Sequence, residues 1–336
     1  MKAIVKKQSN WNYFLLILSV LFVSFGTVSC DDDDDDMDDM MEEAGNIVAS
    51  LEQITTSPGD FYTDDAKSAV LKAQMPKFNH LAQAVVKAGL ATTVATEELT
   101  LFAPTDEAFE MLFTTLGVDG IDDLTADQLT PILLYHVVSG KVKSTDLMNG
   151  YVSTINGAGL MVDLSGDVMI NNAMVMLADL CAKNGVIHII DKVLLPPSMN
   201  LVETALSYDP EFSILVQAVV KADLQTTLET GGPFTVFAPT NAAFANLLTE
   251  LNANSLDDID VATLKAVLLY HVVDGRVFSS DLTTGAVTTL NGAFNVNTST
   301  LKITDANNRE SGLVPTLLDV QATNGVIHVI DKVLLP

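Results

Sequence analysis

The chain of 336 residues carries 17 lysines and arginines against 43 aspartates and glutamates, a formal net charge of −26, and 48% of its residues are hydrophobic. The hydrophobic content argues against a chain that is disordered throughout, and the length is typical of about two domains. The negative charge argues against nucleic acid as a partner, because phosphate binding requires clustered positive charge.

The charge is concentrated near the N-terminus. Residues 1–30 carry three lysines and no acid, whereas residues 31–43 carry ten acids and no base. Residues 44–336 hold 33 acids and 14 bases. The body of the chain is therefore moderately acidic, and one short run contributes much of the net charge.

The first thirty residues have the order of a signal peptide. Lys2, Lys6 and Lys7 precede the apolar run 13–25, and small residues then lead to Cys30. The apolar run is shorter than the ~20 residues that a membrane-spanning helix needs. We therefore predict a cleaved signal peptide at residues 1–29, with a retained transmembrane anchor as the alternative.

The sequence around Cys30 resembles the lipidation site of bacterial lipoproteins, although Thr27 stands where leucine is usual. The resemblance implies that cleavage leaves Cys30 as the first residue and that it is acylated. Three acyl chains anchor a protein stably, because each buried CH₂ contributes about 0.8 kcal/mol. Residues 30–45 would then be the lipidated cysteine and an acidic tether to the membrane.

Six aspartates follow the cysteine directly: Asp31, Asp32, Asp33, Asp34, Asp35 and Asp36. Such a run is typical of a solvated, self-repelling spacer. It also resembles the acidic export signal of Bacteroidetes surface lipoproteins, which implies a lipid-anchored, surface-exposed protein of the outer membrane. Under the sorting rules of enterobacterial lipoproteins, an aspartate directly after the cysteine, here Asp31, would instead favour retention in the inner membrane. A calcium loop is disfavoured, because the run lacks the turn glycine and the closing glutamate.

The chain contains two cysteines, which is too few for the disulfide framework of a small secreted module. Cys30 lies at the junction of the apolar and acidic segments, and Cys181 lies in a strand-like stretch far along the chain. From these different settings we expect no bridge between them.

The remaining sequence is one module repeated. Residues 78–94, 101–105, 133–138 and 184–196 recur in the same order as residues 212–228, 236–240, 268–273 and 324–336. A period of this length is far longer than a solenoid repeat, so each copy should have its own core. We predict domains at residues 46–197 and 198–336. The short linker around Pro197 predicts that they pack together or are held at a restricted angle.

Each copy contains patterns of both helix and strand. Apolar residues recur at helical spacing from Phe78 and from Phe212, and Thr105 and Thr240 offer N-cap oxygens to short helices. Pro131 favours a helix that begins after Thr130, with a capping box from Thr125 to Gln128 as the alternative.

Asparagine–glycine pairs predict antiparallel hairpins with type I′ turns. These pairs begin at Asn156, Asn184, Asn291 and Asn324. The second half of each copy is therefore expected to be mainly antiparallel sheet, and the fold class is α+β.

Three ordered motifs occur twice: LFAPTDEAF (101–109) with VFAPTNAAF (236–244), a Tyr-His pair (135–136 and 270–271), and NGVIHIIDKVLLP (184–196) with NGVIHVIDKVLLP (324–336). Over residues 46–336 they resemble the fasciclin domain family. The resemblance implies two domains, each a wedge-shaped antiparallel β-sandwich with a helical cluster. It also implies secreted or surface-anchored proteins with roles in cell adhesion and extracellular matrix binding.

The Tyr-His pairs are the candidate partner-binding residues. In animal adhesion proteins of the family this motif and its flanking aliphatic residues are associated with integrin binding, which makes Tyr135, His136, Tyr270 and His271 candidates. The residues themselves favour burial, because a Tyr-His pair inside an apolar stretch usually satisfies its polar atoms internally. The sequence leaves both roles open.

No motif in the sequence indicates catalysis. Nucleotide-binding, serine-hydrolase and zinc-protease motifs are absent, and the histidines lack a third ligand at a recognisable spacing, so we predict no metal or cofactor. We expect a membrane-anchored extracellular adhesion or binding protein that engages a protein or glycan. The alternatives are an envelope subunit that binds a small ligand or glycan with outer-membrane partners, and a hydrolase dependent on His136 or His271.

Overall fold

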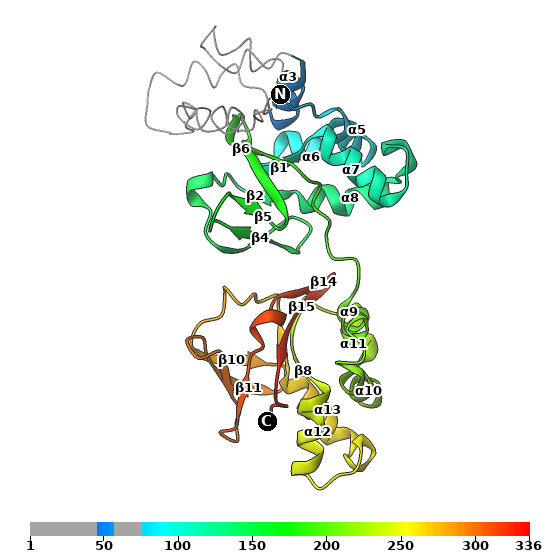
Figure 1. Cartoon of the computed structure of the whole chain (residues 1–336), viewed down its shortest axis with the longest axis vertical. Coiled ribbons are helices and arrows are strands. Elements are labelled where there is room, and N and C mark those ends of the chain that lie inside the picture. The colour runs from blue at the N-terminus through cyan, green and yellow to red at the C-terminus, as the bar shows by residue number, and fades with distance from the viewer. Residues whose placement is uncertain (1–45, 57–75) are drawn as a thin grey trace, which may run out of the picture.

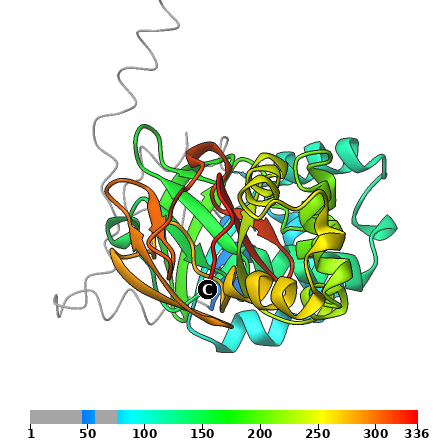
Figure 2. The ribbon, with the colours of Figure 1, turned by 90° about the horizontal axis from the view of Figure 1, so that it is seen from below.

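The computed structural model describes residues 46–56 and 76–336, in which two α+β domains follow one another along the chain (Figure 1). The predicted signal peptide, Cys30 and the acidic tether lie outside the described residues. We call residues 46–197 domain 1 and residues 198–336 domain 2. The helices of both domains lie on the same side of the molecule and the strands lie on the other (Figures 1 and 2).

Both domains contain the same succession of helices. In domain 1 they are α3 (Ile47–Thr56), α5 (Asn79–Lys87), α6 (Ala91–Thr96), α7 (Asp106–Leu116) and α8 (Ala126–Tyr135). In domain 2 they are α9 (Leu201–Ser207), α10 (Ser213–Lys221), α11 (Gln225–Thr230), α12 (Asn241–Glu250) and α13 (Val261–Tyr270). Within the described part of the chain, none of the helices has the length and apolar character needed to cross a membrane.

The strands of domain 1 form one seven-stranded sheet in the order β2-β1-β7-β6-β5-β4-β3. They are β1 (Leu99–Pro104), β2 (Val137–Ser139), β3 (Gly150–Ser153), β4 (Gly159–Asp163), β5 (Met169–Ile170), β6 (Ala173–Ala182) and β7 (Gly185–Ile190). Strand β6 belongs to both halves of this sheet, and its register shifts twice along its length. Such bulges bend a strand, so β6 can fold the sheet over into two layers.

Domain 2 divides the same arrangement into two four-stranded sheets, β10-β11-β12-β13 and β14-β15-β8-β9. The strands are β8 (Phe234–Pro239), β9 (Val272–Asp274), β10 (Gly285–Thr289), β11 (Gly292–Asn297), β12 (Lys302–Thr304), β13 (Glu310–Gly312), β14 (Val320–Ala322) and β15 (Gly325–Ile330). A 3₁₀ turn beginning at Pro315 separates β13 from β14. Proline lacks the N–H that a continuous strand would need at this point.

A parallel strand pair lies at the centre of each domain. Strand β1 pairs with β7, and β8 pairs with β15, over six residues each. The hairpin pattern did not indicate this pairing, because the partners are far apart in the sequence. A Cβ at Gly185 would lie 1.9 Å from the carbonyl oxygen of Leu99, so only glycine allows the two strands to approach.

The hairpins at Asn184 and Asn324 form, but the prediction of type I′ turns is wrong. Neither asparagine, nor the glycine that follows it, has the positive φ that a type I′ turn requires, and at the other two pairs only the glycine has it. A Cβ at Gly325 would lie 2.2 Å from the carbonyl oxygen of Phe234. The neighbouring strand, rather than the turn, therefore requires the glycines that follow Asn184 and Asn324.

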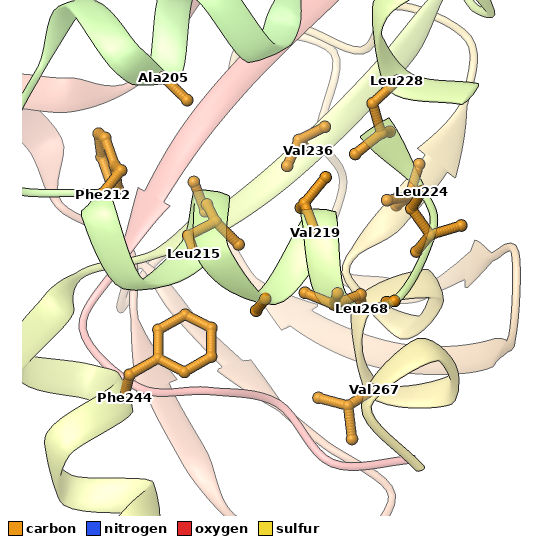
Figure 3. Close-up of a cluster of buried hydrophobic side chains, with 14 of the residues drawn as sticks. Ala205, Phe212, Leu215, Val219, Leu224, Leu228, Val236, Phe244, Val267 and Leu268 are labelled. Carbon is orange, nitrogen blue, oxygen red and sulfur yellow. The ribbon is translucent and has the colours of Figure 1, made fainter. Parts of the chain in front are cut away.

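The central strands are buried on both faces. In β1, Leu101 and Ala103 pack toward the helices, and Phe102 packs between the two layers of strands. The equivalent helical core of domain 2 brings together α10, α13 and β8 (Figure 3). The apolar residues predicted at helical spacing, such as Leu215 and Val219, lie in this core.

The predicted helix caps are confirmed, with one correction. Thr105 Oγ1 accepts the Ala108 N–H at 3.2 Å, and Thr240 caps α12 in the same way. Helix α8, however, begins at Ala126 behind a complete capping box from Thr125 to Gln128, so the expected start after Thr130 is wrong. The box satisfies terminal N–H groups that would otherwise be unpaired, and the helix tolerates Pro131 in its interior.

The two domains contact one another through the outer face of the domain 1 sheet. Gln321 forms two hydrogen bonds with the backbone of Gly159, one from its Nε2 and one to its Oε1, each 2.8 Å long. Beside them the rings of Tyr151 and Phe278 stack with centroids 4.2 Å apart and planes 7° apart. The domains therefore pack together, as the short linker indicated.

This contact uses residues that differ between the two copies. The strand registers place Cys181 at the position of Gln321 and Ala293 at that of Gly159. Lys143 stands at the position of Phe278, because the serine that follows each of them makes the same hydrogen bond to an aspartate. The internal cores keep the same kinds of residue in both copies, whereas the contact does not. It is therefore a specific fit between two unlike surfaces.

Replacing Gly159 with alanine should separate the domains, because the new Cβ would lie 2.4 Å from Cζ of Phe278. We expect a loss of about 1–3 kcal/mol in the free energy of unfolding and faster proteolysis at the linker. The matched control is Gly166→Ala, whose Cβ would meet no atom within 4 Å. Equal unfolding and cleavage rates for the two variants would contradict the contact.

Candidate functional site

The Tyr-His pairs lie at equivalent places in the two domains, where the last helix before the sheet ends. Tyr135 and Tyr270 are the last residues of α8 and α13, and His136 and His271 follow as C-cap residues. All four side chains are buried, with at most 2% of each residue exposed. The candidate partner-binding residues are thus part of the interior in this structure.

Each of these histidines joins a helix end to the C-terminal segment of its domain. His136 Nδ1 lies 2.8 Å from the carbonyl oxygen of Ile132, and its Nε2 accepts the N–H of Leu194 at 2.9 Å. His271 makes the same two contacts with Val267 and Leu334. These partners require a neutral ring with its proton on Nδ1. The geometry explains why the Tyr-His motif and the final LLP motif recur together.

The tyrosine hydroxyls join the same helix ends to the neighbouring hairpin. Tyr135 donates to the carbonyl oxygen of Gly159 at 2.8 Å, and Asn171 donates to the Tyr135 hydroxyl at 3.0 Å. Tyr270 donates to Ala293 at 2.7 Å and accepts from the N–H of Ala306. Burial raises the pKa of both hydroxyls above their ordinary value.

A second pair of histidines lies on the last strand of each domain. His188 Nε2 lies 2.9 Å from the carbonyl oxygen of Val142, and its Nδ1 accepts the N–H of Asp179 at 3.2 Å. His328 makes the equivalent contacts with Val277 and Asp319. Both ring nitrogens are used by the backbone, so neither histidine has a nitrogen available to a metal ion or substrate.

Burial lowers the pKa of all four histidines. The pKa of His136 and of His271 falls to about 4, because burial penalises the charged ring more than the nearby helix carbonyl favours it. Burial is also the main cause that lowers the pKa of His188 and of His328. These four side chains are therefore neutral structural groups at physiological pH.

No cluster suited to holding a metal ion is found in the described ranges. Residues 46–56 and 76–336 contain no group of three or more histidine, cysteine or acidic side chains placed to hold a metal ion. The fifth histidine, His80, packs against the rings of Phe109 and Phe113.

The expectation that the cysteines are not bridged does not hold for Cys181, which is disulfide-bonded and half-buried near the end of β6. The only other cysteine in the sequence, Cys30, lies outside the described residues.

Each domain also has a small apolar cavity between its helices and its central strands. The cavity of domain 1 is lined by residues that include Val85, Val94 and Leu101. That of domain 2 is lined by side chains that include Val219 and Leu228. The equivalent positions and the apolar linings mark both cavities as features of the core, without the polar groups that fix a polar ligand.

The duplicated fold, with the same buried Tyr-His hydrogen bonds in each copy, defines a tandem two-domain protein of α+β class. The chain belongs to the fasciclin domain family, whose model matches residues 76–196 and 210–336. The predicted fold class, two fasciclin-like domains, is confirmed. Domains of this family are typically adhesion or binding modules and are generally not catalytic.

Similar proteins come from animals and bacteria. Human periostin is 32% identical over 287 residues, which cover 81% of this chain and 32% of periostin. Protein sll1483 of Synechocystis is 41% identical over 139 residues, 41% of this chain and 74% of that protein. The cell surface glycolipoprotein MPB83 of Mycobacterium bovis is 36% identical over 112 residues, 32% of this chain and 49% of MPB83. The chain thus spans about a third of the length of periostin.

The stability of both domains should fall on mild acidification. Because the pKa of His136 and His271 is about 4 in the folded state against about 6.5 when unfolded, the unfolded chain binds more protons between these pH values. The contribution of these histidines to the free energy of unfolding is fully present above pH 6.5. It falls as the pH drops through this window, by roughly 3 kcal/mol per histidine at pH 4. Urea unfolding at pH 7.5, 6, 5 and 4 measures the slope. The variant His271→Gln should flatten it, and a wild-type slope of zero would refute the assignment.

The hydroxyl of Tyr270 should contribute to stability through its two buried hydrogen bonds. Tyr270→Phe leaves the carbonyl of Ala293 and the N–H of Ala306 without this partner. We expect a loss of about 1–3 kcal/mol in the free energy of unfolding. The control is Tyr208→Phe, at a residue that is 37% exposed. Equal unfolding curves for both variants would show that the hydroxyl has no such role.

Proposed function

We propose that this protein is a membrane-anchored extracellular adhesion or binding protein that engages a protein or glycan partner through its two fasciclin domains. The observation that carries the proposal is the presence of two complete modules of a binding family behind a lipoprotein-like N-terminal sequence. The name of one similar protein agrees with this role, since MPB83 is a cell surface glycolipoprotein.

The chemistry of the buried histidines supports a role without catalysis. A general base needs a ring nitrogen within reach of the substrate proton. Both nitrogens of His136 and of His271 already contact backbone groups, and both residues are at most 2% exposed. The hydrolase alternative therefore has no observation in its favour.

The partner surface is proposed to lie outside the Tyr-His pairs. Direct contact through Tyr135, His136, Tyr270 or His271 stays a prediction, which would require these buried rings to leave the core. Exposed loops and sheet faces need no such rearrangement. The alternative role as an envelope subunit for a small ligand or glycan gains nothing from the two cavities, because their linings are apolar.

Anchoring is proposed through a lipid on Cys30, with the acidic run as a spacer and export signal to the outer face of the outer membrane. The sequence order of lysines, apolar run and small residues supports it. A lipid thioether uses the thiol of Cys30, and a bridge from Cys181 to the only other cysteine would use the same thiol. The two states exclude one another in a single molecule.

Two cysteine variants distinguish these states. Cys30→Ala should release the protein from the membrane fraction, whereas Cys181→Ala should leave it there, because only Cys30 would carry the lipid. Fractionation followed by blotting measures both. On intact cells, a protease that cannot cross membranes should digest the wild-type protein.

Two outcomes would contradict the proposal. Membrane retention of the Cys30→Ala protein would refute the lipid anchor. A wild-type protein that stays whole on protease-treated intact cells, but is digested after lysis, would refute surface display.

A further inference from the structure

The outer face of β3, β4, β5 and β6 in domain 1 is only partly covered by domain 2. Phe278 and Gln321 cover Tyr151 and Gly159. The strands continue beyond this contact with four outward-facing methionines, which we call the methionine face: Met161, Met169, Met174 and Met176. Their exposed fractions include 39% for Met161, 37% for Met174 and 45% for Met176.

The strand registers give the neighbours of these side chains. Met161 lies directly opposite Tyr151 across the β3–β4 pair, and Met169 lies opposite Met174 across the β5–β6 pair. Side chains alternate along a strand, so the intervening Leu160, Val162 and Ile170 point inward. The methionine face is therefore a largely apolar surface, interrupted by Asp163 on β4, that begins where the domain contact ends.

Domain 2 shows that the fold does not require these methionines. By strand register, Met161, Met169 and Met174 correspond to Asn295, Lys302 and Gly312. In domain 2, Lys302 forms an ion pair with Glu310 on this face. Residues 210–336 contain no methionine, although Val296 and Ile303 preserve the buried side of the same strands.

The two domains share the same fold but not the exposed methionines, so folding alone does not explain these residues. Both copies must bury the inner side of these strands, and both do. Only domain 1 has an apolar outer side, and exposed apolar patches of this kind mark interaction sites. Methionine side chains are flexible and polarizable, which suits a surface that must adapt to a partner.

The charges around the methionine face are mainly negative. Asp163 lies opposite Met169 in the β4–β5 pair, and Asp167 is exposed in the turn that joins these strands. Hydrogen bonds from Ser165 lower the pKa of Asp163, which is therefore ionised at neutral pH. The nearby ammonium of Lys192 donates to the carbonyl oxygen of Asn172. A partner would thus meet apolar side chains next to Asp163 and Asp167, with the ammonium of Lys192 nearby.

We propose that the methionine face binds a second protein whose surface presents apolar side chains beside lysine or arginine. The occupant is inferred from the negative charge of the face and from its continuity with the domain contact. The same charge disfavours a second copy of this acidic chain and an anionic membrane surface. This inference rests on the proposed binding function and gives it a location.

Oxidation of the methionines themselves tests the proposal. Dilute hydrogen peroxide is applied to intact cells and to the purified full chain, and mass spectrometry follows the sulfoxide at each methionine. On cells, Met161, Met169 and Met174 should oxidise several-fold more slowly than in the purified protein. Met111, which is 50% exposed on α7, is the internal control and should oxidise equally in both samples.

A charge variant tests the chemistry assigned to the partner. Asp163→Lys should abolish the protection on cells, because it reverses the charge that a basic partner would meet. Thr304→Lys, a change in the corresponding sheet of domain 2, is the matched control and should leave the protection intact. Protection that survives Asp163→Lys would overturn the basic partner.

Three further outcomes would overturn the proposal. Equal oxidation of the methionine face and Met111 on cells would show that nothing binds there. Protection that appears in the purified chain on concentration, together with a doubled mass by light scattering, would identify a second copy as the occupant. If the face is unprotected on cells whose protein is still digested by external protease, this site fails while the proposed surface display stands.

Discussion

The parallel pairing of the first and last strands of each domain is the constraint on which the rest depends. It joins β1 to β7, and β8 to β15, across most of the length of a domain. Helices pack on one side of these strands and the second layer of sheet packs on the other. The approach is possible only because Gly185 and Gly325 have no side chain where the neighbouring carbonyl oxygens lie.

Buried polar links then fix the remaining segments to this centre. His136 and His271 hold the end of a helix against the C-terminal segment, and the adjacent tyrosines hold it against a hairpin. An unpaired polar group in such an interior costs free energy, so each ring must keep both of its partners. The Tyr-His motif can recur for this reason alone, without any contact with a partner.

Local patterns in the sequence predicted most of the elements, apart from the start of α8 and the type of the turns, but not the contacts between distant segments. Thr105 and Thr240 act as caps because capping depends on residues three positions apart. The parallel pair depends on an approach between Leu99 and Gly185, which no local pattern encodes. The domain contact depends on Phe278 and Gln321, whose importance is visible only when they meet Tyr151 and Gly159.

The contact between the domains also limits assembly. It joins unlike surfaces, a hairpin of one domain and a ring and amide of the next, and a head-to-tail contact of this kind can in general repeat without end. Here domain 1 carries Lys141 and Lys143 where domain 2 carries Arg276 and Phe278, and Ala286 of domain 2 stands where domain 1 has Tyr151. Neither free end reproduces the surface that the contact needs. The residues that make this contact inside one chain are therefore not repeated at the equivalent positions of the other domain.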